Sequence, residues 1–96
     1  MSEPLKLKVR LRSRRVQREM RALLGPDHRR ILSALGALAQ EPRPPGCEKL
    51  ADDIYRIRVG QWRIIYLVDE PNRRVEVGGI RRRSESTYRG VQDLFA

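Results

Sequence analysis

The sequence predicts an α+β fold in which an N-terminal strand and a helical hairpin precede an antiparallel β-meander, in the order β-α-α-β-β-β. Three observations support this prediction. Residues 5–12 and 54–69 alternate between side chains of opposite character, which is the period of a half-buried strand. Between them, apolar residues recur at helical spacing on both sides of a Gly-Pro pair. Residues 90–96 are amphipathic and predict a short C-terminal helical segment.

The predicted N-terminal strand has a basic outer face and leads into a helix. Its apolar positions are Leu5, Leu7, Val9 and Leu11, with lysine and arginine between them. Ser13 suits an N-cap, because its side-chain oxygen can accept a hydrogen bond from the first turn of a helix. The apolar stripe of that helix is Val16, Met20, Leu23 and Leu24, and the opposite side carries Arg14, Arg15, Arg18 and Arg21. We expect this arginine face either to be solvated or to lie against a nucleic-acid backbone.

Gly25 and Pro26 mark the boundary between the two expected helices. Glycine is common just past the end of a helix and proline in a first turn, so the second helix should begin at Pro26 and end near Gln40. Its apolar stripe is Ile31, Leu32, Leu35, Leu38 and Ala39. The proline-rich segment 41–46 then connects the helices to the sheet. Residues 47–53 are expected to form a turn or loop with Leu50 buried.

Residues 54–69 predict a β-hairpin with a two-residue loop at Gly60-Gln61. Glycine at the first loop position suits a type II′ turn, whose twist matches that of the strands. In the resulting register Arg58 faces Arg63. Because successive side chains alternate, the core face is Tyr55, Ile57, Val59, Trp62, Ile64 and Tyr66. The opposite face carries Arg56, Arg58 and Arg63.

The cluster of arginines on one face of the hairpin suggests an anion site. Like charges opposed across strands destabilise a sheet, so Arg58 opposite Arg63 is costly unless an anion lies over them. The guanidinium fork stays charged and matches phosphate bidentately. The alternative is a solvated face, with the arginine stems covering Ile65 and Leu67. For any single arginine we favour solvation, and for the three together we favour an anion site.

The last strand and the tail are also basic. Residues 70–73 form a turn of ordinary composition, and residues 74–80 form a strand in which Gly78-Gly79 indicates a bulge or a close backbone approach. Three consecutive arginines, Arg81, Arg82 and Arg83, leave this strand. At least one of them should point where the hairpin arginines point.

Composition narrows the function further. The 96 residues, with 21 Lys and Arg against 12 Asp and Glu, indicate one small domain of net charge +9, spanning residues 1–96. Such a chain is attracted to polyanions, nucleic acid above all. The single cysteine, Cys47, excludes a disulfide framework or a multi-cysteine metal cluster. No signal-peptide core and no stretch of transmembrane length is present, so we expect a cytoplasmic protein without a membrane partner.

If the basic face binds RNA, cleavage without a metal needs a base, charge stabilisation at phosphate and an acid for the leaving oxygen. Arginine supplies the second and cannot supply the first. His28, the only histidine, lies in a polar run and is expected to be solvated. The remaining candidates for proton transfer are Tyr88, Glu85, Glu76 and Asp69. Tyr88 is the best placed of these, because nearby cations favour the phenolate. The residues alone nevertheless favour the alternative, a buried tyrosine whose hydroxyl is hydrogen-bonded within the fold.

Motifs for cofactors are missing from the sequence. It has no Gly-rich phosphate loop, nucleophile elbow, His-Glu-x-x-His helix or paired-carboxylate motif. We therefore expect neither a metal nor a nucleotide cofactor.

Two stretches resemble the RelE/ParE toxin superfamily of bacterial type II toxin-antitoxin systems. They are the hairpin from Ile54 to Tyr66 and the segment from Arg82 to Arg89. The leading β-α-α part and the proline-rich linker also fit, so the resemblance implies a RelE-like fold over nearly the whole chain. The superfamily contains ribonucleases that cut messenger RNA, typically on the ribosome, and poisons of DNA gyrase.

The RelE-like branch is the better match, and it implies a messenger-RNA endoribonuclease held inactive by a cognate antitoxin. The implied catalytic set is Arg56, Arg58, Arg63, Arg82, Arg83 and Tyr88. The first two would bind the phosphate, Arg63 would stabilise the transition state, Arg82 or Arg83 would assist, and Tyr88 would act as general base or orienting group. Which of the three tail arginines is equivalent stays open.

Two other functions also stay open. The active ribonucleases often have lysine where this chain has Arg56 and Arg58, which removes a possible proton donor. One alternative is a ParE-like gyrase poison, which acts by binding. The other is a catalytically degenerate member that binds only RNA or an antitoxin.

Overall fold

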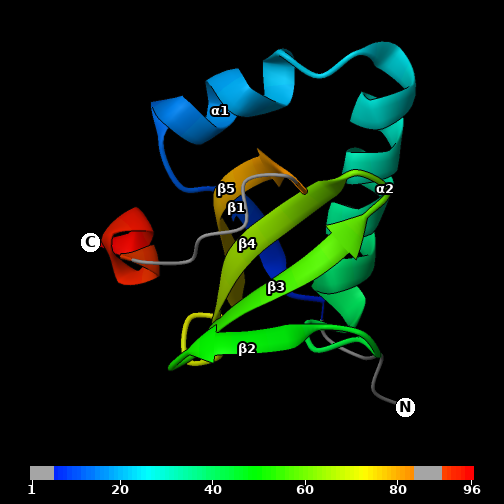
Figure 1. Ribbon diagram of the computed structural model, residues 1–96. Helices are drawn as coiled ribbons and strands as arrows, with labels where there is room; N and C mark the ends of the chain where they lie inside the picture. The colour runs from blue at the N-terminus through cyan, green and yellow to red at the C-terminus, as the bar shows by residue number, and fades with distance from the viewer. Residues whose placement is uncertain (1–5, 84–89) are drawn as a thin grey trace.

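The computed structural model describes residues 6–83 and 90–96, which form a mixed five-stranded sheet with helices on one face and a short 3-10 helix on the other (Figure 1). The elements are β1 (Lys8–Leu11), α1 (Arg14–Arg21), α2 (Gly25–Gln40), β2 (Glu48–Ala51), β3 (Ile54–Val59), β4 (Trp62–Asp69), β5 (Arg74–Arg82) and η1 (Val91–Phe95). Their order confirms the predicted fold class, including the C-terminal helical segment.

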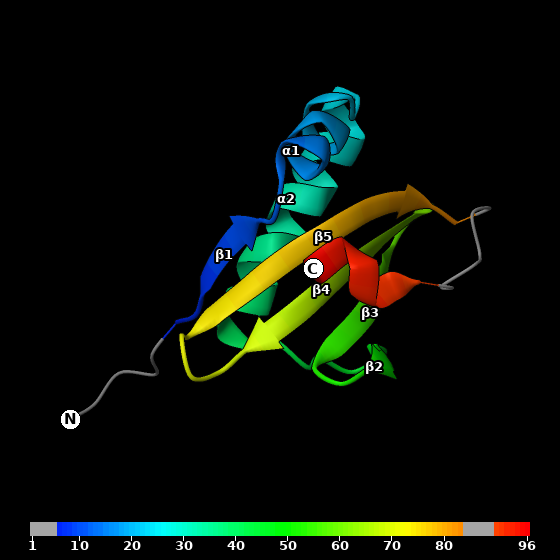
Figure 2. The ribbon, with the colours of Figure 1, turned by 90° about the vertical axis from the view of Figure 1, so that its left-hand side faces the viewer.

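The sheet pairs the first strand of the chain with the last. The strand order is β1-β5-β4-β3-β2, and β1 runs parallel to β5 whereas the other neighbours are antiparallel. Figure 2 shows η1 lying across β4 and β5, on the side of the sheet away from α2. Neither helix of the described part is long and apolar enough to cross a membrane.

The helical hairpin is confirmed, with a correction at the joint between its helices. Ser13 caps α1, its hydroxyl oxygen accepting from the Val16 N–H at 3.4 Å. Helix α1 ends at Arg21, earlier than predicted, and Gly25 is the first residue of α2 instead of a stop after α1. Leu24 precedes α2 in an extended conformation and is 76% exposed, so it leaves the apolar stripe.

Two further expectations about local structure were wrong. Residues 47–53 contain strand β2, which pairs with β3 through Glu48 and Arg56 and leaves Leu50 only half-buried. This strand has four residues and no alternation, so its formation depends on the open edge of β3 and not on its own sequence. Leu32 of the α2 stripe is 56% exposed, because it lies at the rim of the core beside β1.

The central hairpin has the predicted register. Val59 pairs with Trp62 and Arg58 with Arg63 around Gly60, whose φ of +60° suits the first position of a type II′ turn. The predicted core face packs against the helices through Tyr55, Ile57, Ile64 and Tyr66, with Val59 and Trp62 partly buried at its end.

The opposite face of the sheet is only partly open. A second apolar cluster forms there from Ile54, Ile65 and Val91, flanked by Leu50, Ala51, Leu67, Leu94 and Phe95. Ile65 and Leu67 thus pack with apolar side chains of β2, β3 and η1. Arg58 and Arg63 lie on this face next to the hairpin turn, whereas Arg12 and Arg74 lie farther along it and pair with Glu76 and Asp69.

Gly78 forms the predicted bulge in β5. Ile65 pairs with Gly79 and Tyr66 pairs with Val77, which leaves Gly78 as the extra residue. The close backbone approach is present as well, since a Cβ on Gly78 would lie 2.4 Å from Cζ of Phe95. The absence of a side chain at this position lets η1 sit on the sheet.

Where β1 ends, side chains of helix α1 hydrogen-bond to the edge of β5 in its place. Beyond Val77, the Gly78 carbonyl accepts from Arg15 Nη2 at 2.8 Å and the Ile80 N–H donates to Glu19 Oε1 at 3.0 Å. Arg15 and Glu19 also pair with each other at 2.7 Å. Arg15 therefore belongs to the fold, which corrects its assignment to an open arginine face.

We expect Gly78→Ala to lower the free energy of unfolding by about 1–3 kcal/mol, because the new methyl overlaps the Phe95 ring and the bulge cannot widen without moving η1. Urea denaturation measures the change. Gly36→Ala is the matched control, since nothing lies within 4 Å of its Cβ, and it should be neutral or stabilising. Equal effects of the two substitutions would contradict the packing argument.

Candidate nucleic-acid interface

Three neighbouring strands each place one arginine on the same face of the sheet. Arg58 of β3 pairs with Arg63 of β4, and Arg63 pairs in turn with Arg81 of β5. Directly paired residues of adjacent strands point to the same side. We call these three residues the arginine row. It lies on the face away from α2, next to the hairpin turn.

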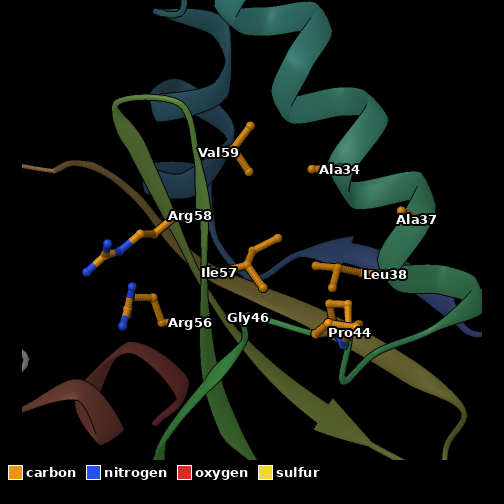
Figure 3. A pocket seen from close by; sticks show the side chains of 10 residues that line it. Ala34, Ala37, Leu38, Pro44, Gly46, Arg56, Ile57, Arg58 and Val59 are labelled. Carbon is orange, nitrogen blue, oxygen red and sulfur yellow. The ribbon is translucent and has the colours of Figure 1, made fainter.

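Figure 3 shows the alternation that sends arginines to this face. Arg56 and Arg58 point away from α2, whereas Ile57 and Val59 point toward it. The predicted separation of a basic face from a core face is therefore present in β3.

The bulge at Gly78 decides which tail arginine joins the row. Val77 and Ile80 both lie in the core, although they are three positions apart and an unbroken strand would send them to opposite faces. The reversal turns Arg81 outward, where its side chain lies against Gly79. The sequence left open which of the three tail arginines joins the hairpin arginines, and Arg81 was only one of them. The paired glycines were the signal that could have identified Arg81, because a bulge there reverses the alternation of β5.

Arg82 and Arg83 take other positions at the same end of the sheet. Arg82 pairs with Trp62, and its guanidinium carbon lies 4.9 Å from the centre of the Trp62 ring, a cation–π geometry. The Arg83 N–H donates to the Gln61 carbonyl at 2.7 Å. Both side chains line a shallow hollow with Gln61 and Arg63.

The hairpin arginines differ in how firmly the fold holds them. Arg56 is only 6% exposed and pairs through Nη2 with Glu48 Oε2 at 2.8 Å, so β2 already supplies it with an anion. Arg63 is 9% exposed, and Arg58 is exposed. A buried guanidinium has lost much of its hydration and is held in place by its surroundings. The row thus combines a buried charge at Arg63 with an exposed one at Arg58.

Comparison with known proteins decides the family. A family model described as ParE toxin of type II toxin-antitoxin system, parDE, matches residues 12–87. The chain belongs to this toxin family, within the RelE/ParE superfamily. No curated protein sequence matches it.

Solved structures of RelE toxins share the fold of this ParE-family chain. A RelE-RelB complex from Pyrococcus horikoshii matches with a TM-score of 0.72 at 23% identity, covering 84% of this chain and 99% of that one. The RelBE2 complex from Mycobacterium tuberculosis has a TM-score of 0.71 at 19% identity, with 88% and 99% covered. A free RelE mutant from Escherichia coli has a TM-score of 0.73 at 17% identity, with 94% and 90% covered.

Of the candidate proton-transfer groups in this ParE-family chain, Tyr88 and Glu85 lie outside the described residues. Glu76 is buried, and its Oε1 lies 2.6 Å from Arg12 Nη1. Asp69 lies where β4 ends, far along the strand from the hairpin turn. Hydrogen bonds from Asn72 lower its pKa, which makes the carboxylate a weaker base.

Tyr66 and His28 are not placed to act at the row either. Burial raises the pKa of Tyr66, whose hydroxyl donates to the Pro42 carbonyl at 2.7 Å on the core face. His28 lies on α2 in an apolar hollow beside β1, half-buried and not solvated as expected. Among residues 6–83 and 90–96, no three His, Cys, Asp or Glu side chains gather closely enough to hold a metal ion.

We expect Arg58→Gln to leave stability unchanged or to raise it by up to about 1 kcal/mol at low ionic strength, because it removes a like charge opposite Arg63. Added salt should shrink the difference by screening. Urea denaturation at two salt concentrations measures it. Arg10→Gln, an exposed arginine on β1 at the far edge of the sheet, is the control. A loss of stability confined to Arg58→Gln would contradict repulsion within the row.

Proposed function

We propose that this ParE-family toxin is a metal-independent endoribonuclease that cuts messenger RNA in association with the ribosome. The observation that carries the proposal is the arginine row, in which Arg58, Arg63 and Arg81 crowd like charges on one face. Such crowding is costly for the sheet alone and favourable once a phosphate lies over it. The net charge of +9 supports a polyanionic substrate.

In the proposed reaction the ribose 2′-oxygen attacks the adjacent phosphorus as a base removes the 2′-hydroxyl proton. The new O2′–P bond forms and the P–O5′ bond breaks, which leaves a cyclic phosphate on one fragment. An acid protonates the departing O5′, so no water enters this step. The Arg63 guanidinium would stabilise the charge that develops on the phosphoryl oxygens. Arg56 and Arg58 would bind the phosphate, and Arg82 or Arg83 would assist at the hollow beside Arg63.

Tyr88 is proposed as the general base or as an orienting group, on the strength of its place in the superfamily motif. The other candidates support this assignment indirectly. Glu76 is engaged by Arg12, and the lowered pKa of Asp69 makes it a poor base. A phenol near several guanidinium groups ionises more readily than one in water.

We also propose a cognate antitoxin as the protein partner and the cytoplasm as the location, with residues 1–96 acting as one toxin domain. The P. horikoshii structure with the same fold is a RelE-RelB complex, and the M. tuberculosis structure is a toxin-antitoxin complex, which supports a similar partner here. An acidic or apolar antitoxin segment could cover the basic face.

The first test is Arg63→Ala. We expect it to reduce RNA cleavage by about 100-fold or more, because a preorganised charge at the developing oxyanion is removed. Brief induction in bacteria followed by mapping of messenger 5′ ends measures cleavage within translated regions. Arg10→Ala removes an exposed arginine at the far edge of the sheet and should leave the cuts unchanged. Unchanged cleavage in folded Arg63→Ala protein would refute the assigned role.

The second test is Tyr88→Phe. Loss of a general base should lower the single-turnover cleavage rate by about 100-fold and change its dependence on pH. A purely orienting tyrosine would lower the rate and leave the pH profile in place. Cleavage by the purified chain in the presence of a chelator checks that no metal is needed. A rate equal to that of the wild type would remove Tyr88 from the mechanism.

The match to the ParE toxin model favours a second candidate, a gyrase poison that acts by binding. The induction experiment separates the two. Growth arrest with intact messages and gyrase-linked DNA breaks would favour the poison. No arrest at all would favour a degenerate member that binds only RNA or an antitoxin.

A further inference from the structure

A second basic hollow lies on the α2 side of the hairpin turn. Arg29, Arg30 and Ser33 of α2 line it on one side, and Arg58 and Val59 of β3 line it on the other. The hollow beside Arg63, Arg82 and Arg83 lies past the turn on the β4 side. The paired residues Arg58 and Arg63 contribute one arginine to each hollow, so the two hollows flank the same turn.

The first turns of α2 are brought to the hairpin by tertiary packing. Figure 1 shows the β3–β4 turn reaching α2, and Nη1 of Arg30 lies 3.6 Å from where a Cβ on Gly60 would stand. Arg29 and Arg30 are both exposed. Thirty residues of sequence separate Arg30 from Gly60, yet both lie at one end of the molecule.

We propose that Arg29 and Arg30 form a second phosphate-binding site, which holds the single-stranded RNA backbone where it leaves the arginine row and passes around the Gly60-Gln61 turn. This inference rests on the proposed ribonuclease function. It assigns to α2 a role in substrate affinity that is separate from the reacting phosphate, since neither residue lies on the face of the arginine row.

The chemistry of the hollow favours nucleic acid over a protein segment. Protein segments generally anchor through large apolar side chains buried in the partner. The exposed large apolar residues of the described chain, Leu24 and Leu32, do not line this hollow, and Leu32 faces an apolar hollow beside β1. The apolar residues that line it, Pro26, Ala34, Ala37 and Val59, are small, and its long side chains are arginines, which suit the regular charges of a phosphodiester chain.

The test compares Arg29→Ala/Arg30→Ala with Arg14→Ala/Arg18→Ala. The control pair removes the same charge from exposed positions on α1, which packs at β5 and β1 and not at the hairpin turn. The probes are 2′-O-methyl RNAs of about 4 and about 20 nucleotides, which retain the phosphates and cannot undergo 2′-oxygen attack. Affinity is measured across a range of salt concentrations, and thermal unfolding checks that each variant is folded.

We expect the α2 variant to bind the long probe about tenfold more weakly and to lose about 1.4 from the salt slope, since each phosphate contact to a single strand contributes about 0.7. Its affinity for the short probe and its cleavage of a short RNA should match the wild type. The α1 control should bind both probes like the wild type.

Other outcomes would overturn the inference. Wild-type affinity of the α2 variant for the long probe, or an equal loss in the α1 control, would show that Arg29 and Arg30 form no specific site. Weakened binding of an acidic antitoxin peptide with unchanged RNA binding would assign the surface to that partner. If the wild-type chain binds neither probe and cleaves no RNA, the proposed function itself fails, which is distinct from failure of the α2 site alone.

Discussion

The extra residue at Gly78 is the constraint on which the arrangement of both faces depends. Before it, β5 pairs with β1 and sends Val75 and Val77 into the helical core. After it, the alternation is reversed, so that Ile80 enters the core and Arg81 turns to the other side. The same position must lack a side chain because Phe95 packs against it. One glycine thus allows η1 to cover part of the sheet and completes the arginine row beside it.

Carboxylates are distributed unevenly along the sheet. Toward the end far from the hairpin turn, Arg12 pairs with Glu76 and Arg74 pairs with Asp69, and in the middle of β3 Arg56 pairs with Glu48. Arg12 also donates to the Phe95 carbonyl at 2.8 Å, which ties η1 to β1. Near the turn, β3, β4, β5 and α2 all contribute arginines. At one end of the sheet the arginines are therefore paired with carboxylates, and at the other end they form a basic surface. A polyanion would be attracted to this basic surface.

The fold alone does not choose between catalysis and inhibition by binding. Similar folds support unrelated activities, and the solved RelE structures share this fold at 17–23% identity, whereas the sequence matches the ParE toxin model. The choice therefore depends on the site. A buried guanidinium between two more accessible ones is suited to a developing negative charge, which is why we favour the ribonuclease proposal.

Elements whose signals are local could be predicted from the sequence. Alternation and a Gly-X turn fixed the register of β3 and β4, and a capping serine fixed the start of α1.

Other features depend on neighbours that are distant in the chain, so only the tertiary structure shows them. Strand β2 forms because β3 offers an edge, and Arg15 is drawn to β5 because β1 ends at Leu11. Arg81 was selected over Arg82 by a bulge whose position follows from pairing with β4, and Arg30 reached Gly60 only when α2 packed on the sheet. Local sequence determines whether a segment alternates as a strand or repeats as a helix. Which neighbour it pairs with, and which face each side chain takes, depends on contacts with residues distant in the chain.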